Sequence, residues 1–158
     1  MAAVKGVKVM RHQAIKRQLI RYGEDIIRSE HMQDSKHFRH HGDTNVYQHS
    51  IAVAACSLWL VRKFRWHVNE ESLVRGALLH DYYLYDWHIP ESHHRLHGFF
   101  HPGVACRNAK RDFQLNELEE DIIRKHMFPL TPLPPRYREG FIVCVADKIV
   151  SVGDYLWN

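Results

Sequence analysis

Two adjacent residues with metal-binding side chains, His80 and Asp81, end the apolar run of residues 76–79. Imidazole and carboxylate groups are both common ligands of divalent transition metals. Adjacent side chains of a helix point about 100° apart, so both can serve one ion only where the edge of their helix meets other helices. The pair therefore predicts a metal site at a junction of helices.

Two further residues of ligand type lie in apolar helical surroundings. Asp147 follows Val145 and Ala146 and precedes Ile149. A buried ionised carboxylate costs on the order of several kcal/mol unless it is paired or bound to a metal. His49 lies close to the apolar stripe of its own predicted helix. Taken singly, each has an alternative: His49 as a hydrogen-bonded core histidine, and Asp147 as the partner of a buried arginine.

Three more residues are candidates for the same chemistry. His101 precedes Pro102, and His126 ends a predicted helix, so each could instead serve its own helix terminus. Lys148 follows Asp147 and could orient its carboxylate or contact a phosphate. A few other basic residues lie near these positions in the sequence and could also contact phosphate: Arg75, Arg107 and Lys125.

The elements that must position these residues are predicted to be helices. Apolar spacing and capping signals predict helices at 10–27, 45–63 and 69–81, then one from Pro102, one at 116–126, and a last one after residue 135 with Asp147 at its middle. Asp43 or Thr44 is expected to cap the second helix. The polar segment 29–45 and the segment 88–100 are expected to be loops, the latter lying over the site. The prediction is an all-α bundle of about six helices.

The bulk composition limits the class of protein. A chain of 158 residues with 45% hydrophobic residues predicts one domain over 1–158, with a core at about 45–157 and a peripheral helix at about 10–28. The net charge is +4, but Lys and Arg are scattered without a dense basic block, which favours a small anionic ligand over a nucleic-acid polymer.

Cysteine usage and hydropathy indicate the compartment. Three cysteines without a C-x-x-C pair favour reduced thiols and a cytoplasmic location. The longest mostly apolar run, 51–61, is too short to span a bilayer, and the first ten residues lack the apolar core of a signal peptide. No membrane association is therefore expected.

Four groups of residues in order resemble a known family. They are Y-Q-H-S at 47–50, A-L-L-H-D at 77–81, the two histidine segments H-P-G-V-A at 101–105 and R-K-H-M at 124–127, and V-A-D-K at 145–148. This pattern is similar to the HD-domain superfamily of metal-dependent phosphohydrolases. The resemblance implies that His49, His80, Asp81 and Asp147 hold a first divalent ion. It also implies that His101 and His126, with Asp81 bridging, could hold a second.

The expected chemistry follows from these ligands. Mixed imidazole and carboxylate ligation suits Mn, Fe, Ni, Co or Zn, as one or two ions. Such an ion lowers the pKa of a bound water and neutralises phosphoryl charge, which predicts hydrolysis of a small phosphoester, a nucleotide or a related monoester or diester, with Asp81 and Lys148 as catalytic residues. Two alternatives are a di-iron oxygenase built on the same ligands and a non-catalytic nucleotide-binding module.

The remaining histidines and a run of aromatic residues are less informative. Fourteen histidines occur in the chain, and His97 is left undecided. Six that fall in polar segments are expected to be solvated: His31, His37, His40, His41, His93 and His94. The aromatic residues after the His-Asp pair could stack on a base, but they are expected to pack on the core: Tyr82, Tyr83, Tyr85 and Trp87.

Overall fold

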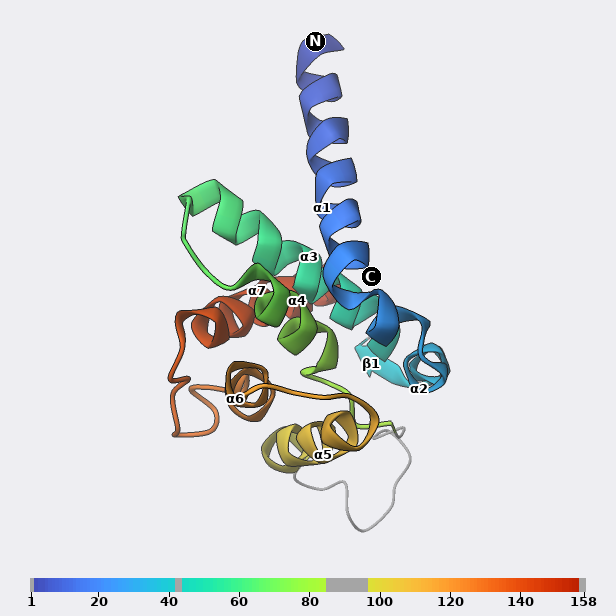
Figure 1. Cartoon of the computed structure of the whole chain (residues 1–158), viewed down its shortest axis with the longest axis vertical. Coiled ribbons are helices and arrows are strands. Elements are labelled where there is room, and N and C mark those ends of the chain that lie inside the picture. The colour runs from blue at the N-terminus through green and yellow to red at the C-terminus, as the bar shows by residue number, and fades with distance from the viewer. Residues whose placement is uncertain (1, 42–43, 85–96, 157–158) are drawn as a thin grey trace.

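The computed structural model describes residues 2–41, 44–84 and 97–156, and the all-α class predicted from the sequence is confirmed. Seven α-helices, a single 3-10 turn and a two-stranded ribbon make up this part of the chain (Figure 1). Their bounds are α1 Ala2–Arg28, α2 Glu30–Asp34, η1 Ser35–His37, β1 Arg39–His41, β2 Thr44–Asn45, α3 Val46–Phe64, α4 Glu70–Leu79, α5 His97–Asp112, α6 Glu117–Lys125 and α7 Arg138–Leu156.

Helix α4 is the central element of the fold. It packs against α1, α3, α6 and α7, while α3 also packs against α7 and α5 against α6. The Asn69 side chain caps α4 by accepting a hydrogen bond from the N–H of Ser72. Acidic residues in the first turn of α4 interact favourably with the positive end of the helix dipole. Seven of its ten residues are buried: Ser72, Leu73, Val74, Gly76, Ala77, Leu78 and Leu79.

Two glycines let other helices approach α4 closely. A Cβ at Gly76 would lie 2.6 Å from Cδ1 of Ile122 in α6, and one at Gly23 of α1 would collide with Leu78. Gly23 also has non-helical backbone angles and marks a kink in α1. The absence of these two side chains allows α4 to be enclosed by α1 and α6, so the end of α4 reaches the interior of the bundle.

The capping residues agree with the sequence except at the start of α3. Asn116 and Glu119 form the capping box of α6. Asn45, rather than Asp43 or Thr44, caps α3, because the Gln48 side chain accepts the Asn45 N–H while Asn45 accepts the N–H of Gln48. Asp147 lies within α7, as expected.

Two helix boundaries next to predicted ligands were predicted wrongly. Helix α4 ends at Leu79, so His80 is its C-cap and Asp81 belongs to the following turn. Helix α5 begins at His97 and contains Pro102, whereas the sequence placed its start at Pro102. Proline removes one hydrogen bond near the N-terminus, and burial of Ala105 and Ala109 further along the helix stabilises it. Residues 97–100 are therefore helical, and 88–96 lie outside the described residues.

The described residues of the segment 29–45 form short regular elements where the sequence predicted a loop. Ser29 caps α2 by accepting the N–H of Met32, and the Met32 side chain is buried. Strands β1 and β2 then pair antiparallel, with Arg39 opposite Asn45. Helix α1 also begins earlier than predicted, at Ala2, and α2 makes the helix count seven instead of about six.

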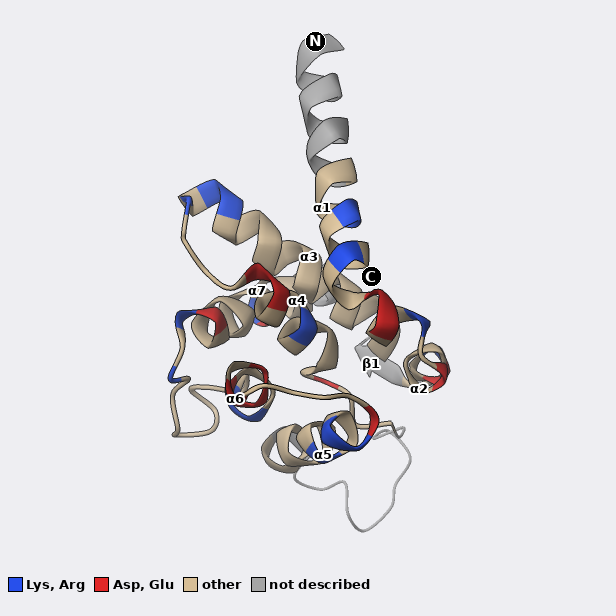
Figure 2. Cartoon of the chain, in the orientation of Figure 1, with Lys and Arg blue, Asp and Glu red and all other residues tan. Residues whose placement is uncertain are grey.

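Charged residues of both signs occur on several of the described helices. Figure 2 shows Lys and Arg in small groups on several helices, with Asp and Glu interspersed among them. None of the described helices is long and apolar enough to cross a membrane.

Candidate metal centre

The first pair of predicted ligands joins α3 to α7. His49, near the start of α3, is completely buried, and its Nε2 lies 3.0 Å from Oδ1 of Asp147 in α7. Ser151, one turn further along α7, donates its hydroxyl to the same carboxylate oxygen at 3.4 Å. The two ligand-type residues are 98 positions apart in the sequence. They meet because α3 packs against α7.

The His-Asp pair reaches this site from the end of α4. Nε2 of His80 lies 3.8 Å from Oδ1 of Asp147 and 3.5 Å from Oδ2 of Asp81. The same Asp81 oxygen is 4.0 Å from Nε2 of His49. Because α4 ends at Leu79, Asp81 leaves the helical path, and both side chains of the pair face one site. We call His49, His80 and Asp147 the first group.

The remaining two histidines lie on the other side of Asp81. His101 of α5 and His126 at the end of α6 have their Nε2 atoms 2.9 Å apart. They lie 3.1 and 3.4 Å, respectively, from Oδ1 of Asp81. We call His101 and His126 the second group. Asp81 therefore stands between the two groups, with Oδ2 toward the first and Oδ1 toward the second.

Backbone carbonyls orient two of the imidazoles. His80 and His126 are the C-cap residues of α4 and α6, and each places Nδ1 against the carbonyl three residues earlier: Ala77 at 2.7 Å and Ile123 at 2.9 Å. The last carbonyls of a helix have no intrahelical donor, so they accept Nδ1–H. This arrangement leaves the Nε2 lone pairs facing the site, as in many metal-binding histidines.

Burial and charge act in opposition on the titration of these groups. Burial disfavours protonated His80, but the carboxylates of Asp81 and Asp147 prevail and raise its pKa. At His126 burial prevails, and its pKa is lowered. Burial acts to raise the pKa of Asp147, yet the imidazoles of His49 and His80 hold it well below its usual range. The Asp147 carboxylate is therefore ionised at neutral pH.

The cluster has the composition and spacing of a metal site. The potential ligand atoms form two sets, and the atoms of each set lie within 4.8 Å of one another. One set is the first group, and the other consists of His80, Asp81 and His126. Within the described part of the chain, Nε2 of the buried His80 has no hydrogen-bond partner. An imidazole nitrogen so placed suits a metal ion, and buried carboxylates gain compensation from a cation.

The basic residues considered for phosphate binding are exposed or contact other groups of the chain. Lys148 is exposed and donates Nζ to the Cys144 carbonyl of its own helix at 3.2 Å, so its catalytic role stays a prediction. Lys125 pairs with Asp121 at 2.6 Å within α6. Arg107 is exposed.

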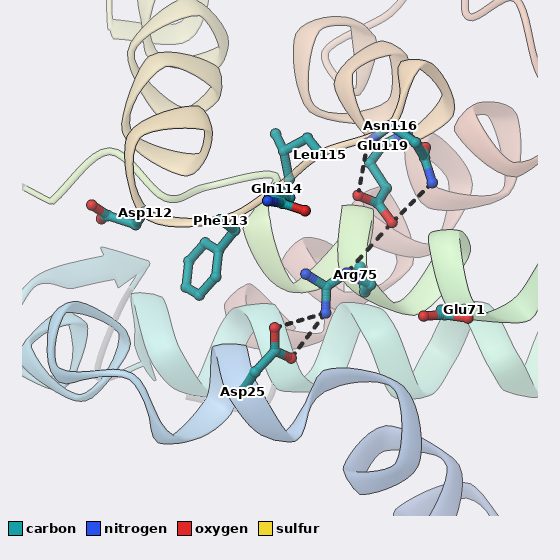
Figure 3. A pocket seen from close by; sticks show the side chains of 9 residues that line it. All are labelled: Asp25, Glu71, Arg75, Asp112, Phe113, Gln114, Leu115, Asn116 and Glu119. Carbon is teal, nitrogen blue, oxygen red and sulfur yellow. Dashed lines mark hydrogen bonds and ion pairs between the residues drawn. The ribbon is translucent and has the colours of Figure 1, made fainter.

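A separate pocket shares no lining residue with the cluster (Figure 3). It has a volume of about 790 Å³ and is lined by the carboxylates of Asp25, Glu71, Asp112 and Glu119, with Arg75 as the basic residue of its lining. Arg75 lies 2.9 Å from both oxygens of Asp25 and 3.5 Å from Glu119. Its guanidinium is thus engaged by acids, and this pocket does not suit a phosphate.

The residues that follow Asp81 pack as expected from the sequence. Tyr82 and Tyr83 are buried, while Tyr85, Trp87 and the histidines between 88 and 96 lie outside the described residues. His31 is not simply solvated: its exposed ring pairs with Asp112 of α5 at 2.8 Å. Sequence reasoning missed three polar residues near the cluster, although helical spacing relates them to predicted ligands: Ser151 lies four residues after Asp147, and Asn108 and Asp112 lie seven and eleven residues after His101.

Comparison with known families agrees with this geometry. The family model described as HD domain matches residues 46–151, which contain all six clustered residues. The chain therefore belongs to the HD domain family. This membership implies the superfamily of metal-dependent phosphohydrolases. No match was found among curated proteins or solved structures.

Proposed function

We propose that this protein hydrolyses a small phosphoester with the help of one or two divalent metal ions. The observation that carries the proposal is the buried cluster of four imidazoles and two carboxylates contributed by α3, α5, α7 and the ends of α4 and α6. Membership of the HD domain family supports the reaction class. A nucleotide or a related monoester or diester is favoured over a polymer, because the basic residues form no dense block in the sequence.

Each of the two groups, together with one oxygen of Asp81, would hold one ion. The first group and Oδ2 of Asp81 would hold the first ion, and the second group and Oδ1 of Asp81 would hold the second. A bound ion supplies neutralisation of charge on a phosphoryl oxygen and acidification of a water. Mn, Fe, Ni, Co and Zn all suit this mixture of ligands.

The chain itself supplies orientation and a dry environment. The carbonyls of Ala77 and Ile123 hold the rings of His80 and His126, and Ser151 holds the carboxylate of Asp147. His49 and His80 are completely buried, and Asp81 is 3% exposed, so water reaches these ligands poorly. Lys148, exposed on α7 next to Asp147, would contact the phosphate of the substrate.

The test combines metal analysis with an activity panel. We expect the purified protein to contain one or two transition-metal ions per chain and to hydrolyse at least one phosphoester with Mn, Ni, Co, Fe or Zn. His80→Ala should lose the first ion and the hydrolysis, whereas His67→Gln, at an exposed histidine outside the cluster, should retain both. Full metal occupancy in His80→Ala would contradict the ligand assignment.

Two outcomes would replace the proposed reaction. A mixed-valence iron pair with no hydrolysis would favour an oxygenase. Tight binding of a nucleotide without turnover of any phosphoester would favour a binding module.

A further inference from the structure

One face of α5 carries three polar residues that all contact the turn after α4. Asn108 follows His101 by seven residues and Asp112 follows it by eleven. At 3.6 residues per turn, these spacings place the three side chains within about 20° of one direction. His101 contacts Asp81, and the other two contact Tyr82 and Tyr83. We call His101, Asn108 and Asp112 the polar face of α5.

Asn108 makes the most specific of these contacts. Its side-chain nitrogen donates to the backbone carbonyl of Tyr82 at 3.1 Å and to that of Tyr83 at 3.2 Å. An amide group has two N–H donors in a fixed plane, so both are used and both carbonyls are satisfied. These carbonyls belong to the two residues that directly follow Asp81. Asn108 therefore ties α5 to the backbone that carries the bridging carboxylate.

Side-chain contacts reinforce this attachment at both ends of the polar face. The Tyr82 hydroxyl donates to Oδ2 of Asp112 at 3.1 Å. The ring of Tyr83 meets that of His101 edge to face, with centroids 5.8 Å apart. The contact between His101 and Asp81 therefore depends on where α5 lies along the 81–83 turn.

The first group is positioned without α5. His49 and Asp147 meet through the packing of α3 on α7, and His80 is held by the Ala77 carbonyl of its own helix. The second group depends on α5 and on α6, which pack against each other. A shift of α5 along the turn therefore changes the second group and leaves the first intact.

We infer that Asn108 is a positioning residue that sets α5 against the turn of Asp81 and so forms the second metal site. The inference rests on the proposed two-ion function. Loss of residues that orient metal ligands typically lowers metal affinity about 10–100-fold. Removing the two amide donors should lower the affinity for the second ion by about this factor. The affinity for the first ion should stay within about threefold of its original value.

The experiment titrates Mn²⁺ into metal-free protein and follows the bound ions and their magnetic coupling by electron paramagnetic resonance. Asn108→Asp keeps the shape of the side chain but replaces both donors by a carboxylate oxygen, and it should bind the first ion normally while the second ion and its coupling appear only at about 10–100-fold higher Mn²⁺. Asn108→Gln keeps the amide group and should recover part of the second affinity. Gln114→Glu is the control, because it makes a comparable amide-to-carboxylate change at an exposed residue that follows α5.

Each outcome decides the inference. Selective loss of the second ion supports it, whereas equal weakening of both ions, or of neither, overturns it. If Asn108→Asp does not fold, Asn108→Ser retains one donor and should show a smaller but still selective loss.

A structure of the metal-free Asn108→Asp variant separates this inference from the two-ion proposal. If the wild-type protein binds a single ion, the two-ion proposal fails and the distance from His101 Nε2 to Asp81 Oδ1 decides the positioning role. Lengthening of this distance beyond its 3.1 Å, with His49 and Asp147 still 3.0 Å apart, supports the role. An unchanged distance overturns it.

Discussion

Substitution of Asp81 by Asn tests the bridging position most directly. The Asp81 carboxylate is 3.1 Å from His101 and 4.0 Å or less from the Nε2 atoms of His49 and His80. The Asp147 carboxylate lies 3.0 Å from Nε2 of His49 and 3.8 Å from Nε2 of His80, the two other members of the first group. We therefore expect Asp81→Asn to lose both ions and Asp147→Asn to lose one.

The magnitude follows from the charge that is removed. Two unit charges about 4 Å apart interact by about 4 kcal/mol at an effective dielectric constant of about 20, and this energy corresponds to about 1000-fold in binding. A divalent ion carries two charges and loses more interaction energy than this. We therefore expect each ion to bind Asp81→Asn at least about 1000-fold more weakly.

The assay is thermal unfolding with and without Mn²⁺, together with metal counting after gel filtration. An ion at about 100 times its dissociation constant stabilises the fold by about 2.7 kcal/mol. For a chain of this size that energy raises Tm by about 5–11 °C. Asp81→Asn should show no such rise, and Asp34→Asn, at an exposed carboxylate of α2, should show the full rise. Retention of one ion by Asp81→Asn at the wild-type affinity would refute the bridging arrangement.

Three further predictions concern the second group, pH and helix packing. His101→Ala and His126→Ala should each lower the metal-to-protein ratio by about one and strongly reduce the rate; an unchanged ratio and rate in both would remove these residues from the site. As pH falls from 8 to 5, protons should displace the ion of the first group before that of the second, because the pKa of His80 is raised and that of His126 is lowered; equilibrium dialysis measures this order, and the reverse order or flat retention would contradict it. Gly76→Ala should lower the unfolding free energy by about 1–3 kcal/mol, because its new Cβ would lie 2.6 Å from Ile122; denaturant titration checks this, and an unchanged midpoint would show that α6 can move away without cost.

The sequence was sufficient to predict the helical class and to name six residues that the fold brings together. Capping signals at Asn69 and Asn116 are local, because they depend on side chains within three residues of the cap. Asp147 was noticeable because a carboxylate in an apolar helix requires a buried partner. Local signals failed where a short segment depended on one buried anchor, as at Met32 of α2.

Only the tertiary structure decided how the other five residues divide around Asp81. The end of α4 at Leu79 turns Asp81 out of the helical path, and α5, which lies further along the chain, contacts the turn that follows. The partners of Arg75 and of Asn108 could not be predicted either, because a bond to a distant carboxylate or backbone carbonyl depends on how the helices pack. Residue types predict which groups can bind a metal, whereas their mutual distances arise from helix packing and from hydrogen bonds between elements remote in the sequence.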